Sequence, residues 1–378
     1  MENTFSYWEQ GAFFKGFDVL IIGSGIVGLS AALNLKSKNQ KLKIGILESG
    51  FLPSGASTKN AGFACFGSVS ELIDELNSSG EDELLKLVEM RWIGLQKLRK
   101  NLGDKAICFN QFGGYELFRN NEAELANSCI ENIPYLNKIL SPIIGTTDIF
   151  AVNNHEIASF GFANSTHLIK NKNEGQIDTG KMMHALLSKV QGMGISIFNN
   201  CRVEKIEYDT KEKILISNQG RFLTRKVILA SNAFIKDLFP EVDVKPGRGQ
   251  VLISEEIKNL KIKGCFHYNR GFTYFRNIDN RVLLGGARDL DFEGEETYNM
   301  GITNTIQNAL EKLLEEVILP NQKVKIESRW SGIMGFGSEL KPIVKELKSG
   351  IFCAVRCNGM GVAMGSLLGE QVAELIDI

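Results

Sequence analysis

A glycine-rich turn between two apolar segments constrains this chain more than any other feature. Gly23, Gly25 and Gly28 follow the apolar run at residues 19–22 and open a segment whose apolar residues recur at helical spacing. In this strand, turn and helix setting, a G-x-G-x-x-G pattern places a pyrophosphate against the helix N-terminus. We expect a dinucleotide site that includes Gly23, Gly25, Ile26, Val27 and Gly28.

Glu48 supports the same interpretation. It lies twenty residues after Gly28, at the end of a second apolar run, residues 44–47. An acid at this place can accept hydrogen bonds from ribose hydroxyls and repels a 2′-phosphate, which disfavours NADP. We expect Glu48 and the adjacent Ser49 to contact the adenosine end of the cofactor.

Composition narrows the class of protein. The chain has 378 residues, 43% hydrophobic and 23% charged, so it can bury a large core and form two domains. A net charge of -1 gives no electrostatic footprint for nucleic acid.

The seven cysteines form no CxxC pair, which favours reduced thiols and no metal site. No apolar run is long enough to span a membrane and the first residues do not resemble a secretion signal, so we expect a cytoplasmic protein.

The rest of the chain alternates between two kinds of pattern. A second apolar strand at residues 226–230 runs into small residues and is typical of a return to a parallel sheet. Residues 251–329 alternate strands with one helix at 303–317, which indicates a second, mainly β domain.

Taken together, these stretches resemble the D-amino-acid oxidase, glycine oxidase and sarcosine oxidase superfamily of FAD-dependent oxidoreductases. The resemblance covers nearly the whole chain and rests on residues 18–50, 55–62, 229–233, 246–250, 282–288 and 358–361 together with Val203. It implies an α/β fold in which an α+β substrate domain is inserted into a Rossmann-like FAD-binding domain. This arrangement is of the glutathione-reductase-2-like kind. The implied FAD-binding parts are residues 1–105, 166–245 and 329–378, and the implied substrate-domain parts are residues 106–165 and 246–328.

The resemblance also implies roles for particular residues. Val203 would meet the adenine through its backbone, and a late helix N-terminus would lie near the pyrimidine edge of the flavin. The implied FAD-binding residues beyond the first turn are Glu48, Ser49, Ala56, Ser57, Thr58, Asn60, Ala61, Gly62, Val203, Ala230, Ser231, Asn232, Gly332, Asn358, Gly359, Met360, Gly361 and Val362. The loop after Gly55 has no histidine and Cys65 lies in no linkage motif, so we expect non-covalent FAD.

Met334 marks a departure from the amino-acid oxidases. These commonly have Gly-x-Arg-Pro here, with an arginine that binds the substrate carboxylate by two hydrogen bonds. A methionine cannot do this, and the local pattern looks more like the γ-glutamylputrescine oxidoreductase branch, which acts on amines. Tyr274, Arg288 and Met334 are the candidate substrate residues.

We therefore expect oxidation of a C–N bond of a small amine or amino acid by hydride transfer to flavin N5, with dioxygen as acceptor. This chemistry depends on positioning, so no general base is named. Three alternatives stay open: a flavin dehydrogenase passing electrons to a quinone or carrier, possibly on a hydroxy acid; a non-catalytic FAD-binding protein; and a protein using NAD alone.

Overall fold

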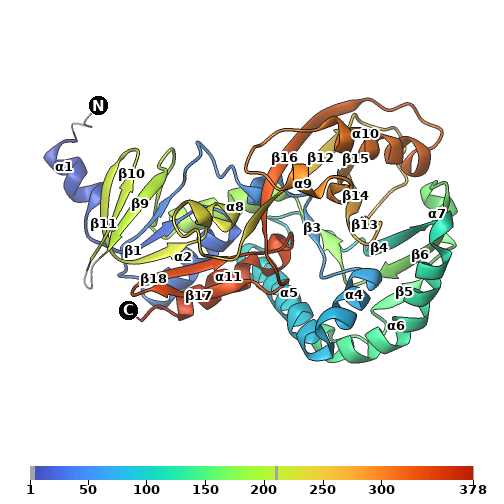
Figure 1. Cartoon of the computed structure of the whole chain (residues 1–378), viewed down its shortest axis with the longest axis horizontal. Helices are drawn as coiled ribbons and strands as arrows, with labels where there is room; N and C mark the ends of the chain where they lie inside the picture. Colours follow the sequence, from blue (N-terminus) through green and yellow to red (C-terminus); the bar gives the residue numbers. More distant parts are fainter. Residues whose placement is uncertain (1–4, 209–211, 378) are drawn as a thin grey trace.

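The computed structural model describes residues 5–208 and 212–377. Within this part, strands form two eight-stranded sheets and a two-stranded sheet. Figure 1 shows the two large sheets at opposite ends of an elongated molecule, with β3 (Phe63–Ala64) and its partner β7 (Gly175–Gln176) between them.

The first sheet has a parallel centre. Its order is β17-β18-β11-β1-β2-β8, with β10 and β9 continuing from β11. The strands are β1 (Phe17–Ile22), β2 (Ile44–Leu47), β8 (Ser196–Phe198), β9 (Val203–Tyr208), β10 (Lys213–Ser217), β11 (Gly220–Leu229), β17 (Ile343–Lys348) and β18 (Ile351–Val355). β1 pairs in parallel with both β2 and β11, so the predicted return of the chain to a parallel sheet is confirmed.

The second sheet is antiparallel except between β13 and β4. Its order is β16-β12-β15-β14-β13-β4-β6-β5. The strands are β4 (Gly114–Arg119), β5 (Phe150–Val152), β6 (Ser165–Asn171), β12 (Lys245–Ser254), β13 (Cys265–Tyr268), β14 (Thr273–Ile278), β15 (Arg281–Gly286) and β16 (Ile326–Phe336).

Helices cover both sheets. They are α1 (Tyr7–Glu9), α2 (Ile26–Lys38), α3 (Ala56–Lys59), α4 (Val69–Ser79), α5 (Glu81–Leu102), α6 (Ala123–Ile144), α7 (Glu156–Phe160), α8 (Thr179–Gly192), α9 (Phe292–Glu295), α10 (Asn304–Leu313) and α11 (Gly361–Glu374). Short 3₁₀ or π-helical segments are η1 (Gln10–Phe14), η2 (Asn120–Glu122), η3 (Asn232–Asp237), η4 (Arg288–Leu290) and η5 (Leu314–Ile318). The helix expected over 303–317 thus becomes π-helical in its last turn.

Glycines let α11 pack closely against α2. A Cβ on Gly365 would lie 2.8 Å from Ile26 Cγ2, and one on Gly369 would lie 2.6 Å from the nitrogen of Ala31. Residues later in α11 contact residues later in α2, so the two helices are parallel. Their N-termini therefore face the same edge of the first sheet. This buried pairing belongs to the largest apolar core.

The N-terminal segment differs in part from the expected surface leader pinned by aromatic side chains. Phe14 packs on Phe222 at 4.8 Å between ring centroids, whereas Tyr7 and Trp8 are exposed. The chain alternates between the two sheets, and residues 166–171 of β6 and 329–336 of β16 lie in the second sheet, although the expected bounds assign them to the FAD-binding domain. The domain boundaries stay a prediction.

Candidate active site

The early glycine turn is shaped by close backbone contacts. Gly23 has φ +104°, and Gly25 precedes the first residue of α2. A Cβ on Gly28 would lie 2.0 Å from the carbonyl oxygen of Gly23. No larger residue fits at position 28 unless the turn moves, so the glycine pattern is a steric requirement here.

The loop of small residues at 56–62 lies against this turn. The hydroxyl of Ser57 accepts a hydrogen bond from the nitrogen of Ile26 at 3.0 Å. Thr58 donates to the carbonyl of Pro53 at 2.6 Å, and the side-chain oxygen of Asn60 accepts from the nitrogen of Gly62 at 2.9 Å. The predicted loop 56–62 therefore contacts the first turn through Ser57. The side chains of Thr58 and Asn60 instead form hydrogen bonds that stabilise the loop.

Glu48 is buried at the end of β2 and oriented by the same turn. Its Oε2 accepts hydrogen bonds from the nitrogen and hydroxyl of Ser24 at 3.0 and 2.7 Å, and its Oε1 accepts from Gly50 nitrogen at 2.9 Å. Ser49 is exposed beside it. Val203, at the start of β9, lines an open hollow of about 420 Å³ with Arg202, Glu204 and Asp237.

The late turn approaches the second sheet. Gly359 has φ +82°, and Met360 caps α11, which begins at Gly361. A Cβ on Gly359 would lie 3.9 Å from the sulfur of Met334, on β16. The N-terminus of α11 therefore faces the second sheet, and Asn358 and Val362 flank it.

Ala230, Ser231 and Asn232 connect the two turns. Ala230 donates its N–H to Ile22 at 2.9 Å, directly before Gly23. Asn232 has φ +49° and its side-chain oxygen accepts from the nitrogen of Arg356 at 3.0 Å, just before the late turn. The structure thus brings together residues that the sequence separates by hundreds of positions.

One cross-strand row defines the face of the second sheet that bears the candidate substrate residues. Cα pairing joins Trp330, Val251, Gly285, Tyr274, His267, Glu116 and Ile169 in that order. Paired residues point to the same face. Tyr274 and His267 both meet the ring of Phe63, at 5.4 and 5.5 Å between centroids. This face therefore lies against the end of the 56–62 loop.

Met334 and Tyr274 each lie over a glycine of a neighbouring strand. A Cβ on Gly249 would lie 2.7 Å from Met334 Cε, and one on Gly285 would lie 2.8 Å from Tyr274 Cε2. Gly332, also predicted, pairs with Gly249. These glycines keep the surface beneath the two side chains flat. Burial also raises the pKa of the Tyr274 hydroxyl to about 12.

Arg288 completes the set of predicted substrate residues. Its guanidinium stacks over the ring of Phe336 at 4.1 Å and over that of Phe292 at 4.9 Å. Burial lowers its pKa below the usual value. Two aromatic contacts therefore hold the guanidinium of Arg288 in place.

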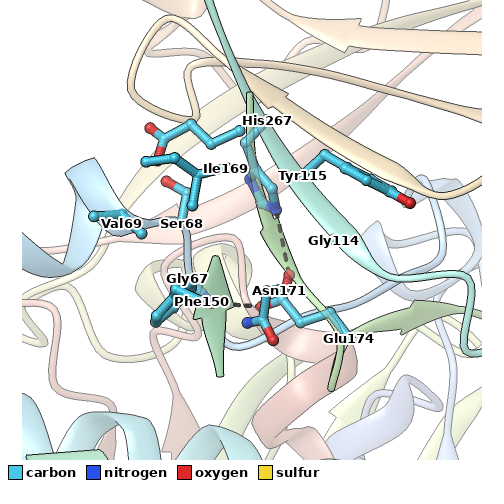
Figure 2. Close-up of a pocket in the computed structure, with 11 residues that line it drawn as sticks. Gly67, Ser68, Val69, Gly114, Tyr115, Phe150, Ile169, Asn171, Glu174 and His267 are labelled. Carbon is cyan, nitrogen blue, oxygen red and sulfur yellow. Dashed lines mark hydrogen bonds and ion pairs between the residues drawn. The ribbon is translucent and has the colours of Figure 1, made fainter. Parts of the chain in front are cut away.

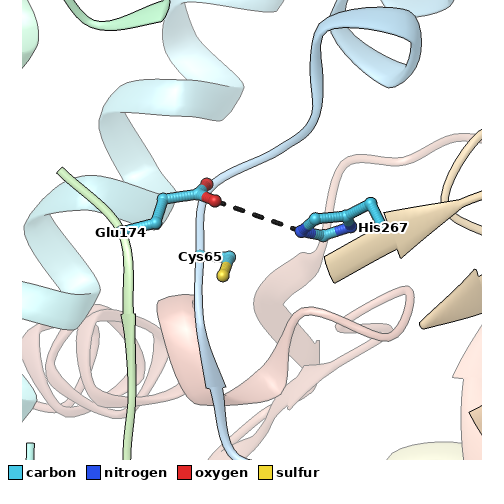
Figure 3. Close-up of side chains that lie close together, drawn as sticks. All are labelled: Cys65, Glu174 and His267. Carbon is cyan, nitrogen blue, oxygen red and sulfur yellow. Dashed lines mark ion pairs between the residues drawn. The ribbon is translucent and has the colours of Figure 1, made fainter. Parts of the chain in front are cut away.

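A buried polar cluster adjoins Phe63 through the ring of His267. Figures 2 and 3 show its members Glu174 and His267. Glu174 accepts hydrogen bonds at Oε1 from the nitrogens of Phe66 and Gly67 at 2.7 and 3.1 Å. Its Oε2 lies 4.0 Å from His267 Nε2. Burial raises the pKa of Glu174 to about 7, lowers that of His267 and raises that of Cys65 well above its usual value.

Cys65, Glu174 and His267 form a compact group whose potential ligand atoms all lie within 4.8 Å of one another. The raised pKa of Cys65 favours the thiol, which is a poor metal ligand. Its sulfur also contacts the carbonyl of Gly175 at 3.8 Å.

Sequence reasoning missed both buried acids of this region, Glu116 and Glu174. Glu116 interrupts the apolar strand Gly114–Arg119, and Glu174 precedes β7 by one residue. The available sequence signal for Glu116 was a charged residue among the apolar residues of a strand.

The geometry fits a long dinucleotide. Two helix N-termini face one edge of the first sheet, and a glycine turn with a steric requirement precedes one of them. The family model described as FAD dependent oxidoreductase matches residues 18–375. The chain belongs to this family. The FAD-dependent oxidoreductase that the sequence predicted is thus confirmed, with FAD as its cofactor.

Individual relatives agree with this assignment. The chain is 27% identical to γ-glutamylputrescine oxidoreductase of Escherichia coli over 95% of its length and 83% of that protein. It is 22% identical to glycine oxidase of Geobacillus kaustophilus, with 96% and 93% covered. The crystal structure of that glycine oxidase matches with a TM-score of 0.76 at 19% identity, covering 96% and 95% of the two chains. L-proline dehydrogenase from P. horikoshii matches with a TM-score of 0.75 at 18% identity, covering 96% and 94%.

These matches confirm the predicted α/β fold class. Within the described part of this FAD-dependent oxidoreductase, no helix has the length and apolar character needed to cross a membrane.

Proposed function

We propose that this FAD-dependent oxidoreductase oxidises the C–N bond of a small amine that has no carboxylate at its reacting carbon, with dioxygen as acceptor. FAD, when bound, accepts a hydride from the carbon next to the nitrogen. The amine becomes an imine, which water hydrolyses, and two electrons reduce dioxygen to hydrogen peroxide.

Met334 is the observation that carries the choice of an amine. It lies between the late turn and the glycines of the second sheet, where a guanidinium would be needed to bind a carboxylate. Its thioether instead makes this part of the wall apolar. The name of the relative from Escherichia coli supports an amine substrate as well.

Residues of both turns would hold the cofactor. The N–H groups of Val27 and Gly28 would face the pyrophosphate, since that of Ile26 donates to the Ser57 hydroxyl, and Glu48 would accept hydrogen bonds from the ribose. The N-terminus of α11 would stabilise negative charge at the flavin. Cys65 is buried and faces Gly175, which supports non-covalent FAD.

The inward face of the second sheet would position the substrate. Tyr274 and Phe63 would form an aromatic wall that packs against the amine substrate and excludes water. We propose that residues 106–165 and 246–328 belong to this substrate domain and residues 1–105, 166–245 and 329–378 to the FAD-binding domain, with β6 and β16 crossing these bounds because both strands pair within the second sheet.

A substrate panel tests the proposal. The purified holoenzyme is mixed without oxygen with γ-glutamylputrescine, glycine, L-proline and glycerol 3-phosphate, and the flavin absorbance is followed. We expect γ-glutamylputrescine to bleach the flavin fastest and hydrogen peroxide to form in air. Faster bleaching by glycine would contradict the role given to Met334, and turnover only with a quinone would indicate a dehydrogenase.

A further inference from the structure

A cavity of about 10 Å³ lies between β4, β6, β13 and the chain that follows Cys65. Ser68 Oγ, Asn171 Nδ2 and His267 Nε2 line it, and all three atoms are buried without a hydrogen-bond partner among the described residues. A cavity of this size with several unpaired polar groups has room for one water molecule. Figure 2 shows His267 and Glu174 on either side of this space.

A water molecule at this place can bridge the two side chains. The 4.0 Å between His267 Nε2 and Glu174 Oε2 is too long for a direct hydrogen bond. Glu174 Oε1 is already occupied by two backbone N–H groups, so Oε2 is the oxygen left for the water. In Figure 3 the imidazole points at this carboxylate.

The charged groups around the pair include both acids and bases. Glu71 on α4 and Glu116 on β4 face it, as do Arg91 on α5 and Arg276 on β14, whose buried guanidinium interacts with Cys65 and Cys265. Arg91 is bonded to Glu71 at 3.0 Å, and Arg270 is bonded to Asp74. Cys65 and Cys265 also adjoin the pair, and the pKa of the Cys65 thiol is raised by burial. Arg276 donates to the carbonyl of Gly62, and neither Arg91 nor Arg276 forms an ion pair with Glu174.

The pair adjoins the proposed substrate wall. His267 is the cross-strand neighbour of Tyr274, and its ring meets Phe63 edge-on. An amine that enters this site arrives as an ammonium ion, yet its C–H bond is oxidised only when the nitrogen is neutral, because the nitrogen lone pair must assist hydride departure.

We propose that Glu174 and His267, bridged by a buried water molecule, accept the proton that an ammonium substrate loses before its C–H bond is oxidised. The inference rests on the proposed amine function. The N–H bond of the ammonium ion breaks, the proton passes by way of His267 and the water, and an O–H bond forms at Glu174 Oε2. The amine keeps the electron pair, so no electrons are transferred in this step.

The surroundings bring the donor and acceptor pKa values closer together. An apolar wall lowers the pKa of an amine. Burial raises the pKa of Glu174 to about 7. The proton transfer is therefore less unfavourable than it would be to an exposed carboxylate, and the acceptor is half ionised near neutral pH.

Glu174→Gln is the decisive variant, because glutamine keeps an oxygen for the N–H groups of Phe66 and Gly67 but cannot take a proton. Flavin bleaching by γ-glutamylputrescine is measured without oxygen from pH 6 to pH 10. We expect the wild-type rate to level off above about pH 7. At pH 7 the bleaching rate of the variant should be at least about tenfold below the wild-type rate. It should return to the wild-type rate near the pKa of the free amine, about 10. His267→Gln should show the same shift, and Glu89→Gln, an exposed carboxylate on α5, should show none.

Infrared titration provides a readout that needs no substrate. The C=O band of protonated carboxyl groups should titrate near pH 7 in the wild-type holoenzyme and lose about half its amplitude in Glu174→Gln, since Glu116 supplies the rest. A variant whose bleaching rate falls equally at every pH, or an unchanged infrared band, overturns the proton-accepting role alone. A wild-type flavin that γ-glutamylputrescine does not bleach at any pH overturns the amine function and this role with it.

Discussion

The carbonyl oxygen of Gly23 occupies the place where any side chain at position 28 would begin, 2.0 Å from an ideal Cβ on Gly28. Gly28 belongs to the first turn of α2, and Gly23 directly follows β1, which ends at Ile22. The steric demand therefore couples the helix start to the shape of the turn.

Gly28→Ala should leave little bound FAD, because the turn must move away from the pyrophosphate. We expect the ratio of flavin to protein absorbance to fall at least about fivefold after gel filtration, since a loss of about 1 kcal/mol of binding is fivefold. Gly192→Ala is the control, because a Cβ there contacts nothing within 4 Å. Full flavin content in Gly28→Ala would contradict the assigned turn.

Met334→Arg should move specificity toward amino acids. A guanidinium at this place can form a charged hydrogen bond with a carboxylate, and such bonds contribute about 1.5–3 kcal/mol. We expect kcat/KM for glycine to rise at least about tenfold and that for γ-glutamylputrescine to fall. Met300→Arg is the control, because Met300 is 46% exposed, and it should leave kcat/KM for both substrates unchanged. An unchanged preference would show that Met334 does not contact the substrate.

Arg248 and Glu295 form a buried two-pronged ion pair, with both N–O distances 2.8 Å. Arg248→Met leaves the carboxylate of Glu295 buried and unpaired, which should lower the free energy of unfolding by about 3–5 kcal/mol. Adding Glu295→Leu should restore most of this loss. Urea unfolding of the single and double variants checks the prediction, and a double variant as unstable as the single one would contradict it.

Glu116 should make the protein less stable as pH rises. Burial raises its folded-state pKa to about 7, above the unfolded value of about 4.5, so the folded state binds more protons between these values. Stability is therefore lost as pH rises from about 4.5 to about 7, by on the order of 3 kcal/mol. Glu116→Gln should reduce the difference between urea midpoints at pH 5 and pH 8, and an undiminished difference would refute the buried titration.

Local chemistry made the first turn and Glu48 predictable, because the strand, glycines, helix and acid lie within one short stretch of sequence. The polar cluster was not predictable in the same way. Its members come from β13, β4 and the residue before β7, and their proximity depends on strand register, which one sequence does not reveal. Met334 was predictable as a departure from a family pattern, whereas its position over Gly249 was not.

The alternation of the chain between its two sheets has a consequence for biosynthesis. β1 lies between β2 and β11, so its second edge stays unpaired until residue 229 has left the ribosome, and β11 waits in turn for β18 at residues 351–355. A nascent chain therefore exposes a sheet edge until residue 355 has been made. Removal of residues 349–378 would leave this edge open and take away both the late turn and α11.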